Sequence, residues 1–456
     1  MKNKLYLAAL PLALACGTLA AQDTFDLHGY MRSGVGRSSN GGEQVSFFLA
    51  NTGGSPTGGP GYRLGNETDN YLELAFDVRA YDKGEESFKL HFRPAFRGYY
   101  QVRDASADAG GGADNVKTAG INQQVWVREA WGEASGIFGK SQLFKDATLW
   151  AGRRFYMRQD NHLRDQWYWN DSGDGVGIEG LNFGFAKFHY AFIQHDSGAV
   201  ASDWNNGGLV NTIAPYSQWV GGGGHFVIGS HDLRLTDIKL WSGGSLTLGY
   251  QFNDAHGDYT ADAAGMNNKG TQYSLIYNQS NVLGGDNRVY ATYGNGNTFW
   301  NWYNPEVKTE NTWWMVMDSL YFKPMKNLEV AATAIYRKQN GKNSMAANTN
   351  TWQSVGVRPM YFFTKHFSIA AELGYDKLKF DNESEDRHLF KETLALQWSP
   401  QASFWSRPSI RIFVTRGQWN QNANAWNRVG EGHFTGADGI DRRQGVTYGA
   451  QIEAWW

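Results

Sequence analysis

The feature that most constrains the fold is a period-two alternation of apolar and polar residues, which recurs along most of the 456-residue chain. Residues 71–79, 88–97, 245–252 and 367–376 carry it most clearly. In the first of these segments one face holds Leu72, Leu74, Phe76 and Val78, and the other holds Tyr71, Glu73, Asp77 and Arg79. Because successive side chains of a strand point to opposite faces, each segment predicts a strand with one oily and one charged face.

The absence of a long apolar segment restricts how such a chain could cross a membrane. After the first 21 residues no stretch has the ~20 apolar residues that a spanning helix needs. The only other structure that satisfies the backbone in lipid is a closed β-barrel. Glycine is abundant, with 55 residues, and neither a linker nor a Pro-rich hinge divides the chain. We therefore expect one large all-β architecture.

The connections between the predicted strands alternate in length. Short turns at 82–85, 242–244 and 364–366 alternate with long polar stretches at 104–123, 254–269 and 418–442. Short turns at one rim and long loops at the other are typical of outer-membrane barrels. A soluble β-sandwich or propeller also alternates, but it explains neither this loop pattern nor the secretion signal described next. The pattern favours a transmembrane antiparallel β-barrel.

The N-terminus has the composition of a signal peptide. Lys2 and Lys4 precede an apolar run at 5–15, and small residues surround Ala20. We expect residues 1–21 to be a cleaved signal peptide and residues 22–456 to form the barrel domain in the bacterial outer membrane. Cys16 offers lipid attachment as an alternative, although the residues before it match such sites poorly.

Charge and cysteine content exclude several partners. The segment that remains after cleavage contains no cysteine, so neither a disulfide nor a thiolate metal site is available. Loss of Lys2 and Lys4 changes the formal charge from −2 to −4, which gives no general attraction to nucleic acid. We expect outer-membrane lipid and small solutes as partners, with no nucleic acid and no cofactor.

Four aromatic residues lie in phase with charged residues rather than with the oily face. They are Tyr30, Tyr71, Trp405 and Trp455, each alternating in step with an Arg, Glu or Asp. On a barrel wall this phase points into the lumen. A pyranose can rest its C–H face on an aromatic ring while its hydroxyls bond to guanidinium and carboxylate groups. The pattern favours a sugar track; the alternative is that the rings only fill space.

At this point the residues resemble the maltoporin family. The matching motifs are HGYMRSG at 28–34, YRLGNE at 62–67, WAGRRFY at 150–156, the stretch 158–169, VRPMY at 357–361, WSRP at 405–408 and the final tryptophan pair. The middle third, 183–353, resembles the family less. The resemblance implies an eighteen-stranded barrel, a homotrimer, and a third loop at about 157–174 that folds inward and narrows the pore.

The resemblance also assigns roles to matching positions. Tyr30, Tyr71, Trp405 and Trp455 correspond to the family's aromatic slide. The polar track and constriction correspond to Arg32, Arg63, Glu73, Arg128, Arg158, Asp160, His162 and Asp165, with Trp167 standing where the family has a tyrosine. Two departures concern the slide: the stretch 104–123 contains no tryptophan, and a mid-slide phenylalanine is replaced near Asp286.

These features predict facilitated diffusion of maltose and maltodextrins. A porin for another oligosaccharide, such as sucrose, and a general diffusion porin are alternatives within the same class. An outer-membrane hydrolase is a third, since Glu73 and Asp160 could form a carboxylate pair. The chain has no zinc-binding His-Glu-x-x-His, phosphate loop or Gly-x-Ser-x-Gly motif, so we expect a channel and not an enzyme.

Overall fold

The computed structural model describes residues 24–39, 44–49, 61–99, 123–196, 226–257, 269–296, 298, 310–341, 349–420 and 443–456. The strands are β1 (Phe25–Ser38), β2 (Asp69–Lys83), β3 (Glu86–Tyr99), β4 (Gln123–Ser135), β5 (Thr148–Arg154), β6 (Gln159–Asn161), β7 (Gln166–Trp169), β8 (Gly173–Asn182), β9 (Lys187–Asp196), β10 (Phe226–Trp241), β11 (Gly244–Gly257), β12 (Lys269–Val282), β13 (Gly285–Gly296), β14 (Thr312–Met325), β15 (Leu328–Asn340), β16 (Asn350–Phe362), β17 (Phe367–Phe380), β18 (Arg387–Trp398), β19 (Ser409–Trp419) and β20 (Gln444–Trp455). In the described ranges no helix could span a bilayer. The predicted signal segment 1–21 lies outside them.

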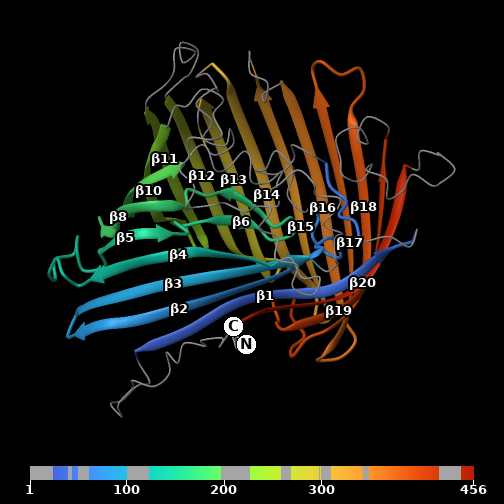
Figure 1. Cartoon of the computed structure of the whole chain (residues 1–456), viewed down its shortest axis with the longest axis horizontal. Helices are drawn as coiled ribbons and strands as arrows, with labels where there is room; N and C mark the ends of the chain where they lie inside the picture. The colour runs from blue at the N-terminus through green and yellow to red at the C-terminus, as the bar shows by residue number, and fades with distance from the viewer. Residues whose placement is uncertain are drawn as a thin grey trace, which may run out of the picture.

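Eighteen of these strands form a closed antiparallel barrel, which confirms the predicted fold class. Each strand pairs with the next along the chain, apart from β6 and β7, which form a separate hairpin between β5 and β8. The barrel closes where β1 pairs with β20 and Tyr30 lies opposite Trp455 (Figure 1). Closure leaves no strand edge unpaired, as a membrane-spanning sheet requires.

The connections differ between the two rims, as the sequence predicts. On one rim β2 passes to β3 and β10 to β11 through two-residue turns, where Gly84 and Gly243 adopt positive φ. On the other rim the chain runs from 419 to 444 between β19 and β20. The rim with short turns therefore corresponds to the periplasmic side of an outer-membrane barrel.

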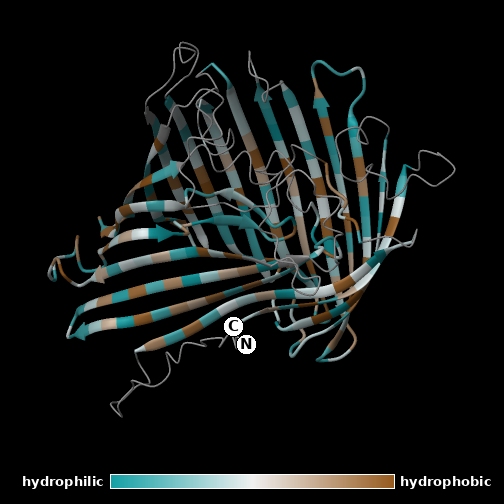
Figure 2. Cartoon of the chain, in the orientation of Figure 1, coloured by the Kyte–Doolittle hydropathy of each residue, from teal (hydrophilic) through white to brown (hydrophobic). Residues whose placement is uncertain are grey.

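The outer wall is apolar and carries an aromatic belt. Figure 2 shows apolar and polar residues alternating along the strands. Tyr250, Tyr273, Tyr293 and Trp314 lie opposite one another on four successive strands, and all four side chains are exposed. Rings of Tyr and Trp on the outside of a barrel mark the interface between lipid and water.

The segment 61–68, which precedes β2, packs inside the barrel against its far wall. The Tyr62 ring lies against Gly356 of β16 and Gly374 of β17, where a Cβ atom would overlap the ring. The backbone of Leu64 accepts a bond from Lys391 Nζ at 2.8 Å and donates to Glu372 Oε1 at 3.0 Å. Glycine on two paired strands thus creates the space that this loop occupies.

The loop between β5 and β8 also reaches the far wall. It spans 155–172, two residues earlier than the predicted 157–174. Asn161 bonds to Thr333 of β15 at 2.8 Å, and Arg164 bonds to Asp376 of β17 at 3.0 Å. The Arg164 guanidinium also lies 4.7 Å from the Tyr62 ring, so the two loops contact each other within the barrel.

The two loops bury part of the inner wall. The expectation that inward-facing side chains all line a water-filled lumen is therefore corrected. Many inward side chains of β14, β16 and β17 are buried, including apolar ones such as Trp313, Trp352 and Leu378 and charged ones such as Glu372. Inward side chains of β1–β4, such as Tyr30 and Arg93, stay partly exposed. The water-accessible side of the interior therefore lies along β1–β4.

Candidate functional site

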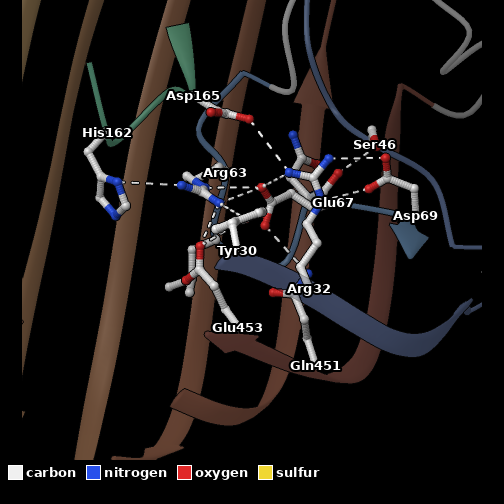
Figure 3. A network of polar contacts seen from close by, with 12 residues as sticks. Tyr30, Arg32, Ser46, Arg63, Glu67, Asp69, His162, Asp165, Gln451 and Glu453 are labelled. Atoms are coloured by element: carbon white, nitrogen blue, oxygen red, sulfur yellow. Dashed lines mark hydrogen bonds and ion pairs between the residues drawn. The ribbon is translucent and has the colours of Figure 1, made fainter. Parts of the chain in front are cut away.

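A network of charged side chains lies where β1, β20 and the two loops meet (Figure 3). Its centre is Glu453 on β20, which accepts bonds from Arg63 at 2.6 Å, Arg411 at 2.7 Å and Arg407 at 3.0 Å. The Tyr30 hydroxyl donates to the same carboxylate at 3.2 Å and accepts from Arg63 at 2.9 Å. The network fixes Arg63 and the Tyr30 ring on the inner wall.

Arg32, two residues after Tyr30 on β1 and on the same face, joins the network to carboxylates of β2 and of the two loops. It contacts Asp69 at 2.8 Å, Glu67 at 3.1 Å and Asp165 at 3.7 Å. Its guanidinium lies 5.3 Å from the centre of the Tyr71 ring. The two predicted polar residues beside Tyr30 and Tyr71, Arg32 and Arg63, are therefore both held by carboxylates of the loops or of the barrel wall.

Aromatic rings form a row from the loop side to the turn side of the barrel. Tyr71, near the start of β2, lies 6.1 Å from Tyr30, which is the register partner of Trp455. The His162 ring lies 6.0 Å from Trp455 and 5.0 Å from Trp405, in the turn between β18 and β19. All four predicted slide residues thus belong to one row, with His162 joining its last two members.

Trp405 belongs to the row but does not lie on a strand, contrary to the prediction from the sequence. Strand phase with Arg407, Ser409 and Arg411 placed it on a strand, but β19 begins only at Ser409. Trp405 instead lies in the periplasmic turn, where its side chain is 44% exposed. Its phase argument was wrong, although the ring still lies beside His162.

Three of the predicted constriction residues, Arg158, Asp160 and Trp167, lie in the loop 155–172. The Arg158 guanidinium lies between two rings, 3.3 Å from the centre of Phe155 and 3.9 Å from that of Trp167. Arg128 Nε bonds to the Tyr71 hydroxyl at 3.2 Å, and Tyr71 donates in turn to Glu73. Asp160 lies on β6 in the same loop. Trp167 thus keeps an aromatic surface against Arg158.

His162 is held as a neutral imidazole. Burial, reinforced by the nearby Arg63, lowers the pKa of His162 well below its usual value. Arg63 Nη1 lies 3.4 Å from its Nδ1. Among the described residues no group of three or more His, Cys, Asp or Glu side chains is arranged to hold a metal ion.

Comparison with known families decides the classification. The family model described as LamB porin matches residues 25–456. The chain belongs to the LamB porin family. The match includes 183–353, where the resemblance in sequence is weakest.

Two solved structures are similar to this chain over nearly its whole length. Acinetobacter baumannii OccAB2 is 10% identical with a TM-score of 0.50, covering 95% of this chain and 98% of that one. The outer membrane protein opdK of Pseudomonas aeruginosa is 8% identical with a TM-score of 0.49 and the same coverage. At this identity the likeness concerns the barrel fold alone. Family and fold together point to a porin of the bacterial outer membrane.

Sequence reasoning missed several residues of this LamB-family site. Glu453, Glu67 and Asp69 hold the arginines, and a signal for them existed: Glu453 is in phase with Trp455, and Glu67 ends the motif at 62–67. Tyr321 of β14 was also missed. Its ring lies 5.8 Å from Trp405, and its hydroxyl donates to Glu329 at 2.7 Å.

Tyr321 lies beside the position where the resemblance predicts the loss of a slide aromatic. Its register partner on β13 is Asp286, the position near which the family's phenylalanine is replaced. An aromatic ring is therefore present there, supplied by the neighbouring strand.

Proposed function

We propose that this porin conducts maltose and maltodextrins by facilitated diffusion along the aromatic row. The observation that carries the proposal is the row of rings Tyr71, Tyr30, Trp455, Trp405 and Tyr321, which extends from the loop side to the turn side of the barrel, with His162 between Trp455 and Trp405. Such a row offers an apolar surface to successive pyranose rings, and sites of similar strength allow the sugar to move on.

The charged network supplies the hydroxyl partners. Arg32 lies over Tyr71, and the Arg407 guanidinium lies 3.9 Å from the centre of the Trp455 ring. Guanidinium groups donate and carboxylates accept, so both kinds of sugar hydroxyl contact are available beside the rings. The family favours passage of a solute over catalysis, and we propose no reaction for the Glu73 and Asp160 carboxylates.

Current block in planar bilayers tests this function. Maltodextrins of increasing length should reduce the ion current with half-blocking concentrations that fall as more rings are covered, whereas sucrose should block weakly. Equal block by sucrose and by maltodextrins of every length would contradict the proposal and favour a general diffusion porin.

We also propose that the loop 155–172 sets the conductance. Arg158, held between Phe155 and Trp167, is a large side chain of this loop inside the barrel. Arg158→Ala should raise single-channel conductance and loosen sugar selectivity. Conductance equal to that of the unmodified porin would argue against a narrowing role for this loop.

Trimer formation is a further part of the proposal, and it rests on the family alone. Chemical cross-linking and light scattering of the purified porin in detergent should give three chains per particle, and a monomer would contradict it. Secretion through removal of residues 1–21 is tested by the N-terminal sequence of the mature protein.

A further inference from the structure

Three arginines surround the phenyl ring of Phe155, close to Tyr71, the first ring of the aromatic row. The Phe155 ring centre lies 3.3 Å from the guanidinium carbon of Arg158, 5.5 Å from that of Arg93 and 5.9 Å from that of Arg128. The three side chains come from the loop 155–172, from β3 and from β4, so the fold gathers them from separate parts of the chain.

Among the described residues, two carboxylates form ion pairs with these arginines, and other groups also use both of them. Glu129 pairs with Arg93 at 2.7 Å, and its second oxygen accepts the Phe155 N–H at 3.0 Å. Glu73 contacts Arg93 at 3.3 Å and Arg128 at 3.9 Å and accepts the Tyr71 hydroxyl. These two carboxylates pair with Arg93 and Arg128, so one of the three guanidinium groups is left without an ion pair in the described part of the chain.

Arg158 is the unpaired one. Within the described ranges no carboxylate forms an ion pair with Arg158; Asp160 in the same loop interacts with it only over a longer distance. Burial lowers the pKa of Arg158 to about 10, which still leaves it charged at pH 7. Its two flat faces are covered by Phe155 and Trp167, so its N–H groups can donate only along the edge of the guanidinium plane.

An edge of guanidinium donors beside two further arginines is the arrangement that binds a phosphate, sulfate or carboxylate group. We propose that Arg93, Arg128 and Arg158 form a subsite for the anionic substituent of a charged sugar whose pyranose rings lie on the row that begins at Tyr71. The subsite rests on the proposed sugar function and adds a substrate class to it. Arg128 connects the two, since its Nε bonds to the Tyr71 hydroxyl.

The test compares a neutral and a charged sugar of equal length. In planar bilayers at 0.1 M KCl, maltose 1-phosphate should block the current at about a tenfold lower concentration than maltose, which is ~1.4 kcal/mol. The difference should shrink at 1 M KCl, where screening acts over about 3 Å. Inorganic phosphate should compete with maltose 1-phosphate and leave block by maltose unchanged; phosphate that displaces neither sugar would overturn the subsite.

Two variants and a matched control locate the effect. Arg158→Gln should remove the preference for the charged sugar, and Arg128→Gln, whose side chain is 42% exposed, should reduce it with little risk to folding. Arg154→Gln is the control, because Arg154 also stacks on aromatic rings but pairs with Glu179 at 2.7 Å. A preference that survives in both test variants, or falls equally in the control, refutes the assignment.

The outcomes separate this inference from the sugar function itself. If maltodextrins block but maltose 1-phosphate blocks no better than maltose, the subsite is wrong and the sugar track stands. If neither maltose nor longer maltodextrins block while maltose 1-phosphate does, the maltodextrin function is wrong and the anionic subsite stands.

Discussion

Trp405→Ala tests the aromatic row most directly. The Trp405 ring is 44% exposed and contacts Phe404, His162 and Tyr321 at ring-centre distances of 4.9, 5.0 and 5.8 Å. In the described residues its backbone N–H, bonded to Ser403, is the one polar group of Trp405 with a hydrogen bond. Truncation therefore removes a platform without breaking part of the charged network.

The expected loss follows from the covered area. A pyranose face resting on the indole covers about 55 Å² of apolar surface, and at ~25 cal/mol per Å² this is worth about 1.4 kcal/mol. That free energy corresponds to about a tenfold rise in the half-blocking concentration of maltotriose. Open-channel conductance should be largely kept. Tyr71→Ala should weaken block by a similar factor, although it also removes the bonds to Arg128 and Glu73.

Trp314→Ala is the control, since Trp314 belongs to the outer aromatic belt and stacks on Tyr336 at 5.0 Å. Titration of multichannel current with maltotriose should give the wild-type constant for this variant. The reasoning is refuted if the half-blocking concentration of maltotriose for Trp405→Ala is within twofold of the wild-type value. It is also refuted if Trp314→Ala loses as much affinity for maltotriose as Trp405→Ala.

Three further predictions concern single positions. Tyr321→Ala should weaken maltodextrin block several-fold while Tyr321→Phe retains it, because the ring and not the hydroxyl bonded to Glu329 meets the sugar; equal loss in both, measured by current titration, would contradict this. Gly374→Ala should displace the Tyr62 ring and cost about 1–3 kcal/mol of stability, visible as a lower thermal transition in circular dichroism; an unchanged transition would contradict the packing. Burial lowers the pKa of His162 well below its usual value, so as the pH falls the unfolded chain gains a proton there before the folded porin does, and the contribution of His162 to stability falls as the pH falls through about 6.5. Sugar block should be equal at pH 7.5 and pH 5.5; a difference that His162→Gln abolishes would contradict the lowered pKa.

The wall of the barrel was predictable because its pattern is local. Alternation along a strand is set by the pleat, so the segments 71–79 and 367–376 could be assigned their lipid and lumen faces without knowledge of their partners. The boundary of β19 was also within reach, since Pro408 lacks the N–H that a ladder needs and is a signal for a strand that begins after it; the phase argument overlooked this signal and placed Trp405 on the strand.

The filling of the lumen was not predictable, because it depends on contacts between distant residues. Nothing near Gly356 or Gly374 indicates that Tyr62 will pack on them. The place of Tyr321 depends on its register with Asp286, and β13 and β14 are joined on the long-loop rim, where no short turn fixes the register. The sequence therefore identified a missing aromatic ring but could not find its replacement on the next strand.

Burial separates two kinds of charge that look alike in the sequence. Glu372, Lys391 and Arg358 alternate in phase with the lumen as Arg128 does, yet they are buried and bind one another and the backbone of Leu64. Removing one partner of such a buried set costs about 3–5 kcal/mol, so substitutions there should impair folding of the porin. Arg128, by contrast, is 42% exposed beside Tyr71, so its substitution should change the block of ion current by sugar rather than folding. The alternation along a strand thus identifies charged residues that point inward. Whether such a residue stabilises the fold or contacts the solute depends on whether the inserted loops bury it.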